Sequence, residues 1–277
     1  THVALLESAV DDPLDSASAL EVLMGSSTDV LDIQTPPPAT GRKAPVPVGL
    51  PALSPLAVHD ALGDYDIVGV LGGGNLGTVY KGYDRRRRRV VALKVLSAEL
   101  AQDPNVVARF LRGAKTGGRL SHRHIVKVLG AGHAAGRIYV TMEFVEGLNL
   151  EQFCEASGGR LIPPVALGIM NRITAALVFA HGREIVHRNV SPQNILIGPG
   201  GSPKLADLAL AKRSTVKKVS MTITSKGQVL TASVFSSPEA VLGEPMDVRS
   251  DVWGVGATLF RALTDRAPYG NDPKKLT

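Results

Sequence analysis

The sequence HRNVSPQNIL, residues 187–196, is the most informative segment of the chain, and other short motifs lie around it in a fixed order. Downstream come KLADLA at residues 204–209, SPE at residues 237–239 and SDVWG at residues 250–254. Upstream come the glycine-rich run LGGGNLGTV at residues 71–79 and the strand-like VALK at residues 91–94. So many ordered motifs are not credible as chance, and they predict one domain that spans most of the chain.

The glycine-rich run contains G-x-G-x-x-G at Gly72, Gly74 and Gly77. Glycines let backbone amides approach phosphate oxygens without a side chain in the way. A dinucleotide-binding fingerprint would need a helix directly after the glycines. Here Thr78–Tyr83 continues as a strand and turns at Asp84 into a second strand. The pattern therefore predicts a strand–loop–strand hairpin, the glycine loop that kinases place over nucleotide phosphates.

Lys94 is the one charged residue of the apolar VALK strand. A lysine in such a setting needs an anionic partner, and nucleotide phosphates would serve. The alternative is an edge lysine whose ammonium reaches solvent along its own stem. The glycine loop just upstream favours the functional interpretation.

Taken together, these motifs resemble those of the protein-kinase family in order and spacing. The stretches RFLR (109–112), RLSHRHIV (119–126) and SSPEAVLGEPMDVRSDVWGVGATLFRALTDRAPY (236–269) resemble the bacterial serine/threonine kinases in particular. The resemblance covers about residue 64 to the end. It implies an α+β fold with two lobes: a five-stranded antiparallel sheet plus one helix, then a mainly helical lobe that is truncated.

The resemblance also implies roles for single residues, with ATP and Mg²⁺ as cofactors. Met142 would be the gatekeeper, Glu143 to Val145 the hinge that contacts adenine through backbone groups, and Asn194 and Asp207 the Mg²⁺ ligands. Arg188 would receive a phosphorylated activation segment, and Asp251 would brace the catalytic loop. The remaining expected ATP contacts are Gly72, Gly74, Gly77, Val79, Ala92, Lys94 and Leu196.

The sequence departs from the family where phosphoryl transfer is catalysed. Asn189 stands where the family has its catalytic aspartate, and an amide cannot accept the substrate proton; loss of a general base typically costs about 10²–10⁴ in rate. Ser191 replaces a lysine that supplies positive charge to the transferring group. Ala232 replaces a threonine that hydrogen-bonds both. Three changes around one function indicate release from that function.

A further departure lies in the expected helix Val106–Leu120, where Gly113 aligns with the family's glutamate that pairs with the strand lysine. The sequence has no acid between Asp103 and Glu143, so Lys94 has no partner in that helix. Gly113, Gly117 and Gly118 should each weaken the helix by roughly 1 kcal/mol relative to alanine. Leu208 and Ala209, in place of phenylalanine and glycine after the metal-binding aspartate, are milder changes.

Periodicity and composition set the expected organisation. Residues 1–34 form an acidic tail, residues 35–62 a proline-rich linker or a ligand for a proline-binding module, and residues 63–277 the kinase domain. The chain begins at Thr1 and stops in a polar stretch, so we expect both ends to be cuts. Expected strands are Tyr65–Leu71, Thr78–Tyr83, Val90–Leu96, Ile125–Ala131 and Ile138–Phe144; the other expected helices are Leu148–Ala156, Pro164–His181 and Val252–Leu263.

Charge is distributed unevenly along the 277 residues, whose net charge is +6. Residues 1–60 carry eight acids and two bases, so the remainder carries a net +12. This predicts either an anionic partner or a basic surface around a phosphate site. The single cysteine, Cys154, and the absence of a run of about 18 apolar residues favour a reducing, cytoplasmic location with no membrane contact in this segment.

Several other features carry weaker hypotheses. The run Arg85–Arg89 lies on an expected turn, where solvation is usual, and without aromatic neighbours we expect no nucleic acid. The basic stretch between residues 109 and 127 is a docking site for an acidic partner or a solvated surface. The histidines match no strong zinc pattern. Phosphate acceptors for another kinase are Ser214, Thr215, Ser220, Thr222, Thr224 and Ser225.

Three functions fit this sequence. The first is a pseudokinase that binds ATP and Mg²⁺ and acts through a regulatory protein partner. The second is a weakly active serine/threonine kinase, because positioning and metal can support some turnover without a base. The third is a fold kept only as an interaction module. Thermal shift with ATP and transfer assays distinguish the three.

Overall fold

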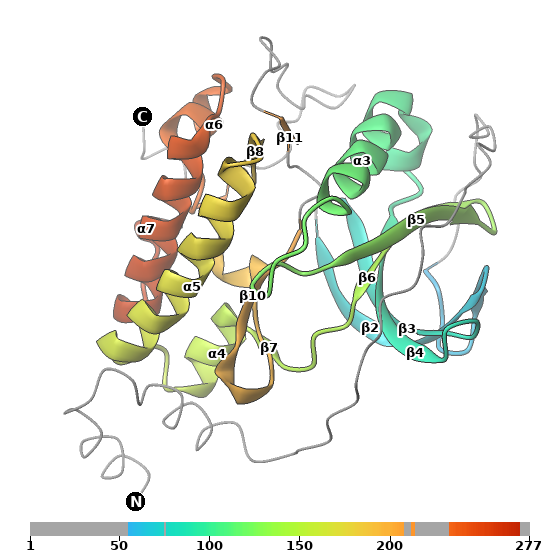
Figure 1. The fold of residues 1–277 in the computed structure, drawn as a ribbon, viewed down its shortest axis with the longest axis horizontal. Coiled ribbons are helices and arrows are strands. Elements are labelled where there is room, and N and C mark those ends of the chain that lie inside the picture. Colours follow the sequence, from blue (N-terminus) through green and yellow to red (C-terminus); the bar gives the residue numbers. More distant parts are fainter. Residues whose placement is uncertain (1–54, 75, 208–211, 214–232, 272–277) are drawn as a thin grey trace, which may run out of the picture.

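The structure is a computed structural model that describes residues 55–74, 76–207, 212–213 and 233–271 (Figure 1). Two lobes are present, each with its own buried core. The expected acidic tail and most of the expected linker lie outside the described residues, as do Leu208, Ala209, Ala232 and the six expected phosphate acceptors.

The N-terminal lobe is built on an antiparallel sheet with strand order β1-β2-β3-β4-β6-β5. The five expected strands are all present, and the two-residue strand β1 extends the sheet at one edge. The strands are β1 (Ala61–Leu62), β2 (Tyr65–Gly74), β3 (Gly77–Asp84), β4 (Arg89–Leu96), β5 (Val128–Ala134) and β6 (Arg137–Glu143).

Strand β4 is the centre of this lobe because its residues from Val91 to Leu96 are all buried. Alternate side chains of a strand point to opposite faces, so β4 contributes to two cores. Val91, Leu93 and Val95 pack on one face, in a cluster with Leu62, Ile67 and Tyr80. Leu96 packs on the other, in a cluster with Val106, Phe110 and Val140.

Helix α3 (Pro104–Gly117) covers this second face of the sheet (Figure 1). Asp103 caps its first turn by accepting a hydrogen bond from Asn105 N at 2.8 Å, and Pro104 occupies the first helical position, where no donor is lost. The helix starts two residues before the predicted Val106 and ends three before Leu120. Leu120 is buried beyond the helix end, in a cluster with Ala176 and Ala180.

The C-terminal lobe is mainly helical, with α5 and α7 side by side (Figure 1). Its helices are α4 (Leu150–Ala156), α5 (Pro163–His181), α6 (Pro238–Leu242) and α7 (Val248–Thr264). Its short strands are β7 (Leu148–Asn149), β8 (Ile185–Val186), β9 (Ile195–Ile197), β10 (Pro203–Leu205), β11 (Lys212–Arg213) and β12 (Pro268–Asn271). It also has turns of 3-10 helix at Pro192–Asn194 and Pro199–Gly201, and the N-terminal lobe has one at Leu100–Gln102.

Among the described residues, α5 is one helix that is long and apolar enough to cross a membrane by length and composition. Its residues Ile169 and Ile173 are fully buried in the core of the C-terminal lobe. A buried helix of this kind passes the same length and composition test as a membrane span, so we assign α5 to the core of the lobe.

The prediction for the fourth strand was wrong by three residues at its start. Ile125 and Val126 do not join the sheet; they run beside Leu205 of β10 in the other lobe. Val126 N donates to Leu205 O at 2.9 Å, and Leu205 N donates to His124 O at 2.9 Å. These backbone bonds divert the segment from the sheet, and they fix one edge of the junction between the lobes.

Candidate functional site

The glycine loop joins β2 to β3, with Gly74 opposite Gly77 in a hairpin, as the sequence predicts. Gly77 has φ +144°, and a Cβ there would lie 2.0 Å from Val95 O, so the fold itself requires this glycine. Gly72 and Gly74 differ, because a Cβ at either position would meet no atom within 4 Å. Their backbone is open to a ligand, and packing in the chain does not explain why they are glycines.

Four of the expected ATP contacts share one face of the sheet. Val79 of β3 lies opposite Lys94 of β4, and Ala92 lies opposite Met142 of β6. Directly opposed residues point to the same face, and so do residues two apart on a strand. The register therefore places Val79, Ala92, Lys94 and Met142 together, although nothing in their sequence spacing alone fixes that arrangement.

The ammonium group of Lys94 contacts the carboxylate of Asp207, with Nζ and Oδ1 2.6 Å apart. The two side chains are 10% and 21% exposed, so water screens this ion pair only partly. Asp207 holds a left-handed backbone conformation with φ +66°. The sequence predicts no partner for Lys94 in α3; in the structure, an acid of the other lobe, 113 residues away, pairs with it.

Gly113, which the resemblance aligns with the family's glutamate, lines a cavity together with both members of this ion pair. A small cavity of ≈ 20 Å³ separates α3 from the sheet there, room for about one water molecule. It is lined by Lys94, Phe110, Gly113, Ala114, Val128, Val140, Met142 and Asp207. Glycine at this position, without a side chain, leaves space next to the lysine.

The expected adenine contacts Val145 and Leu196 lie outside the N-terminal sheet, after β6 and on β9 of the C-terminal lobe. Leu196 lies on β9 opposite Lys204 of β10. Val145 packs near Gly198, directly after β9, where a Cβ would lie 3.3 Å from Val145 Cγ1. Both residues therefore lie where the hinge meets β9, which fits the expected adenine contacts.

Glu143 at the end of β6 uses its side chain to join the lobes. Its Oε1 accepts hydrogen bonds from Lys127 N at 2.7 Å and from Lys204 Nζ at 2.8 Å. The sequence assigned only the backbone of Glu143 a role, and no sequence signal connects it with Lys204, 61 residues away.

The loop that carries Asn189 is hydrogen-bonded to the carboxylate of Asp251 on α7, and Asp251 is fully buried. Its carboxylate accepts hydrogen bonds from His187 N at 2.8 Å and Arg188 N at 2.6 Å, and His181 Nε2 lies 2.7 Å from the same carboxylate. His187 Nδ1 accepts from Asn189 N at 3.3 Å, so we assign the ring proton to Nε2, which donates to Ala206 O at 2.9 Å. Asp251 therefore braces this loop, as the resemblance implies.

Asn194 and Asp207 are brought together by a backbone hydrogen bond of 2.7 Å from Ala206 N to Asn194 O. The side-chain nitrogen of Asn194 donates to Asn189 O at 2.8 Å, so its amide oxygen is the side-chain atom that could bind a metal ion. An amide oxygen and a carboxylate are hard ligands of the kind that Mg²⁺ takes. The donor set fits the expected ion.

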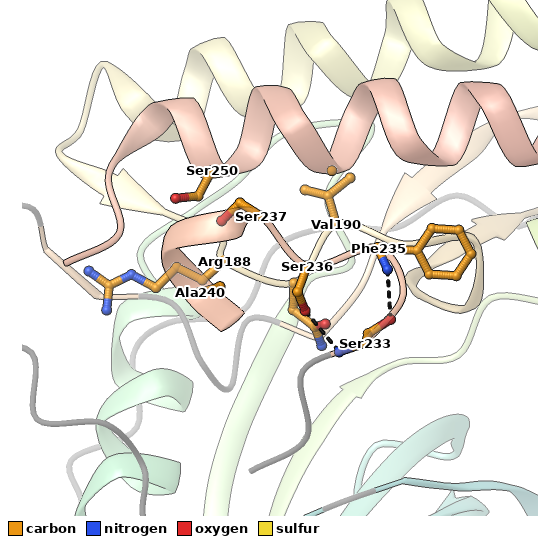
Figure 2. Close-up of a pocket in the computed structure, with 10 residues that line it drawn as sticks. Arg188, Val190, Ser233, Phe235, Ser236, Ser237, Ala240 and Ser250 are labelled. Atoms are coloured by element: carbon orange, nitrogen blue, oxygen red, sulfur yellow. Dashed lines mark hydrogen bonds between the residues drawn. The ribbon is translucent and has the colours of Figure 1, made fainter. Parts of the chain in front are cut away.

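Asn189 and Arg188 line a second pocket, between the catalytic loop and the segment before α6 (Figure 2). That segment is fixed by its own hydroxyls: Ser233 N donates to Ser236 Oγ at 2.8 Å, and Phe235 N donates to Ser233 Oγ at 3.2 Å. Burial lowers the pKa of Arg188, and the nearby Asp251 carboxylate partly offsets that shift. The Arg188 guanidinium donates to Met246 O, and in the described chain it has no ion pair.

The arginine run has partners close by. Arg85 pairs with Asp66 at 2.7 Å, Arg86 with Asp64 at 3.3 Å and Arg87 with Asp84 at 3.4 Å. All lie at the β3–β4 turn or near β2, so much of the positive charge of this run is neutralised by its own lobe.

Comparison with known proteins gives consistent matches. The family model described as "Protein kinase domain" matches residues 65–277. The serine/threonine-protein kinase PrkC of Bacillus subtilis is 37% identical over 210 residues, covering 76% of this chain and 32% of PrkC. PknB of Mycobacterium tuberculosis is 34% identical over 212 residues, covering 75% of this chain and 33% of PknB.

Solved structures agree with these matches. The crystal structure of the PknI kinase domain from M. tuberculosis is 27% identical and superposes with a TM-score of 0.63, covering 79% of each chain. The chain spans about a third of the length of the curated relatives it matches. From the cleft, the bracing of its loop and these relatives together, the chain belongs to the protein kinase family, with bacterial serine/threonine-protein kinases as its relatives.

Proposed function

We propose that this kinase domain binds ATP with Mg²⁺ but transfers phosphate to protein serine or threonine poorly, and that it acts through a regulatory protein partner. The observation that carries the proposal is a division within the cleft. The phosphate- and metal-facing groups Lys94, Asn194 and Asp207 stand in one connected arrangement. The groups that would activate the substrate hydroxyl and stabilise the transferring phosphoryl group are replaced.

The geometry of the retained groups supports nucleotide binding. The open backbone at Gly72 and Gly74 leaves room for phosphate oxygens. Lys94 is already held by an anion, Asp207, and a phosphate oxygen can take that carboxylate's place. When bound, Mg²⁺ would neutralise charge on the phosphates, with Asn194 and Asp207 as its protein ligands.

Weak transfer follows from the side chains at two positions. Asn189 presents an amide, which can orient a hydroxyl but cannot take its proton, and a missing base typically costs about 10²–10⁴ in rate. Ser191 is 4% exposed and neutral, so it adds no positive charge for the transferring group. The deficit therefore lies in the chemical step.

A weakly active kinase is the second candidate, and one observation favours it. Asp251 still fixes the catalytic loop through His187 N and Arg188 N, so a bound substrate would meet an ordered loop. Phosphoryl transfer has a loose transition state for which positioning and charge supply most of the catalysis.

One paired experiment tests both candidates. Thermal unfolding with ATP, with and without Mg²⁺, should show a Mg²⁺-dependent rise in Tm that Asp207→Ala removes. Radiolabel transfer to a generic protein substrate should be near background, and Asn189→Asp with Ser191→Lys should raise it. Clear transfer by the unaltered chain that Asp207→Ala abolishes favours the weak kinase. Absence of any shift with ATP would contradict nucleotide binding.

A further inference from the structure

A further polar pocket lies next to the hinge residue Glu143, and no residue of the glycine loop lines it. Its volume is ≈ 270 Å³, and it is lined by Ser121, His122, Arg123, Ile125, Lys127, Glu143 and Lys204. It lies where the segment between α3 and β5 crosses β10 and the end of β6 (Figure 1). None of the proposed phosphate and metal contacts lines this pocket.

The lining of this pocket carries an excess of positive charge. Arg123, Lys127 and Lys204 contribute three cations, and Glu143 is the one acid among the lining residues. Lys204 already neutralises Glu143 at 2.8 Å. Within the described part of the chain, Arg123 and Lys127 form no ion pair, and both are exposed. Two uncompensated cations therefore share one pocket.

The backbone around the pocket is fixed in place. Ile125 N donates to His122 O at 3.1 Å, Val126 N donates to Leu205 O at 2.9 Å, and Lys127 N donates to Glu143 Oε1 at 2.7 Å. Because these hydrogen bonds to two lobes fix the backbone, a ligand would have to order only the side chains of the pocket.

His122 adds a directed donor to this frame. Its Nδ1 accepts a hydrogen bond from His124 N at 3.2 Å, so in the neutral ring the proton sits on Nε2. The ring packs against Phe179 with centroids 5.0 Å apart, which limits its rotation. His122 lines the same pocket as Arg123 and Lys127, so its Nε2–H adds a neutral donor to that lining.

We propose that this pocket binds a phosphate monoester. A phosphate monoester brings up to two negative charges and three acceptor oxygens, which match a guanidinium fork, an ammonium group and an imidazole N–H. The pocket is smaller than the roughly 300–1,000 Å³ of common ligand sites, so it fits one compact charged group and its attachment. The source is either a phosphorylated side chain or a small phosphate ester.

The test uses the 277-residue chain and a fluorescein-labelled phosphothreonine peptide, followed by anisotropy. We expect it to bind, its unphosphorylated twin to bind at least about tenfold more weakly, and inorganic phosphate to compete. Arg123→Gln with Lys127→Gln should weaken binding about tenfold, equivalent to about 1.4 kcal/mol. Arg112→Gln with Lys115→Gln is the matched control: it removes the same charge from exposed positions of α3 outside the pocket, and should change affinity less than about twofold.

Further arms locate the probe and separate the two sources of phosphate. Lys94→Ala should bind the peptide as the unaltered chain does; loss of binding there would place the probe in the nucleotide cleft and overturn the proposal. Equal weakening by the control pair, or equal affinity for both peptides, would also overturn it. Tighter binding of the peptide than of glycerol phosphate indicates a phosphorylated side chain, and the reverse order indicates a small ester; both support the site.

Discussion

At the scale of single residues, the glycine motif separates into two kinds of position. Gly77 satisfies the fold, because a side chain there would overlap Val95 O. Gly72 and Gly74 satisfy no packing requirement in the described structure, and the proposed phosphate ligand would supply a reason for both. The sequence predicted the three glycines as one motif, and only the coordinates show that their causes differ.

This difference predicts that two alanine substitutions affect different properties, one the stability of the fold and the other ATP binding. Gly77→Ala should lower the free energy of unfolding by about 2 kcal/mol or more, because a positive φ and a backbone overlap add together. Gly72→Ala should change it by less than about 0.5 kcal/mol but weaken ATP binding. Urea unfolding and ATP-dependent thermal shift measure the two properties. Equal stability losses would contradict the distinction.

The sequence predicted individual site residues but not which of them pair with one another. Lys94, Asn194 and Asp207 could be predicted because each sits in a motif with fixed local spacing. The pairing of Lys94 with Asp207 in this structure, and of Glu143 with Lys204, could not, because each joins segments more than 60 residues apart. Such contacts depend on how the lobes meet, and the pattern of a single segment carries no information about that.

At the scale of elements, the types were predictable and several of their ends were not. Periodicity identified α3 and α5, but α3 starts earlier because Asp103 and Pro104 supply a cap and a first helical residue. Strand β5 starts three residues later than predicted because Ile125 pairs with Leu205 of the other lobe. Helix ends and strand ends are decided by hydrogen bonds to other elements, and these lie outside the local pattern.

The contact between α6 and α7 predicts a dependence of stability on pH. Burial raises the pKa of Glu239, but hydrogen bonds from Ser250 Oγ and the backbone outweigh it, so its pKa lies below the ordinary value of 4.5. A lowered pKa stabilises the folded state above the ordinary value, and this stabilisation is lost as the pH falls through the folded-state pKa.

Glu239→Gln should therefore lower stability by about 1 kcal/mol at neutral pH, allowing for screening at a partly exposed site. The difference from the unaltered chain should shrink as the pH falls below 4.5. Urea unfolding at several pH values measures it, and Glu244→Gln, at an exposed position of the same region, is the control. A difference that stays constant with pH would count against the assignment.

At the scale of the whole molecule, the two lobes are joined by ion pairs as well as by the chain. Lys94 of β4 pairs with Asp207, and Glu143 of β6 pairs with Lys204 of β10. The sequence predicted two lobes because strand-like runs give way to helical runs after Phe144. It did not predict these two contacts, each of which joins a strand of the N-terminal lobe to a residue of the C-terminal lobe.

A double-mutant cycle tests the first of these pairs. Lys94→Met or Asp207→Asn alone leaves one group partly buried without its partner and should cost about 2 kcal/mol, less than the 3–5 kcal/mol of fully buried pairs. The double variant should be more stable than the sum of the single losses predicts, by about 1 kcal/mol. Urea unfolding without nucleotide supplies the four values, and strictly additive losses would mean that the pair contributes nothing.

The space beside Gly113 has a consequence for selective inhibition. A compound that fills the cleft and extends past Met142 would enter a cavity of ≈ 20 Å³ lined by Lys94, Gly113 and Asp207. In relatives that carry the family's glutamate at the position of Gly113, that side chain would compete for the same room and for the same lysine. A methyl-sized or small acidic substituent aimed at this point would therefore distinguish this kinase domain from relatives with a glutamate there.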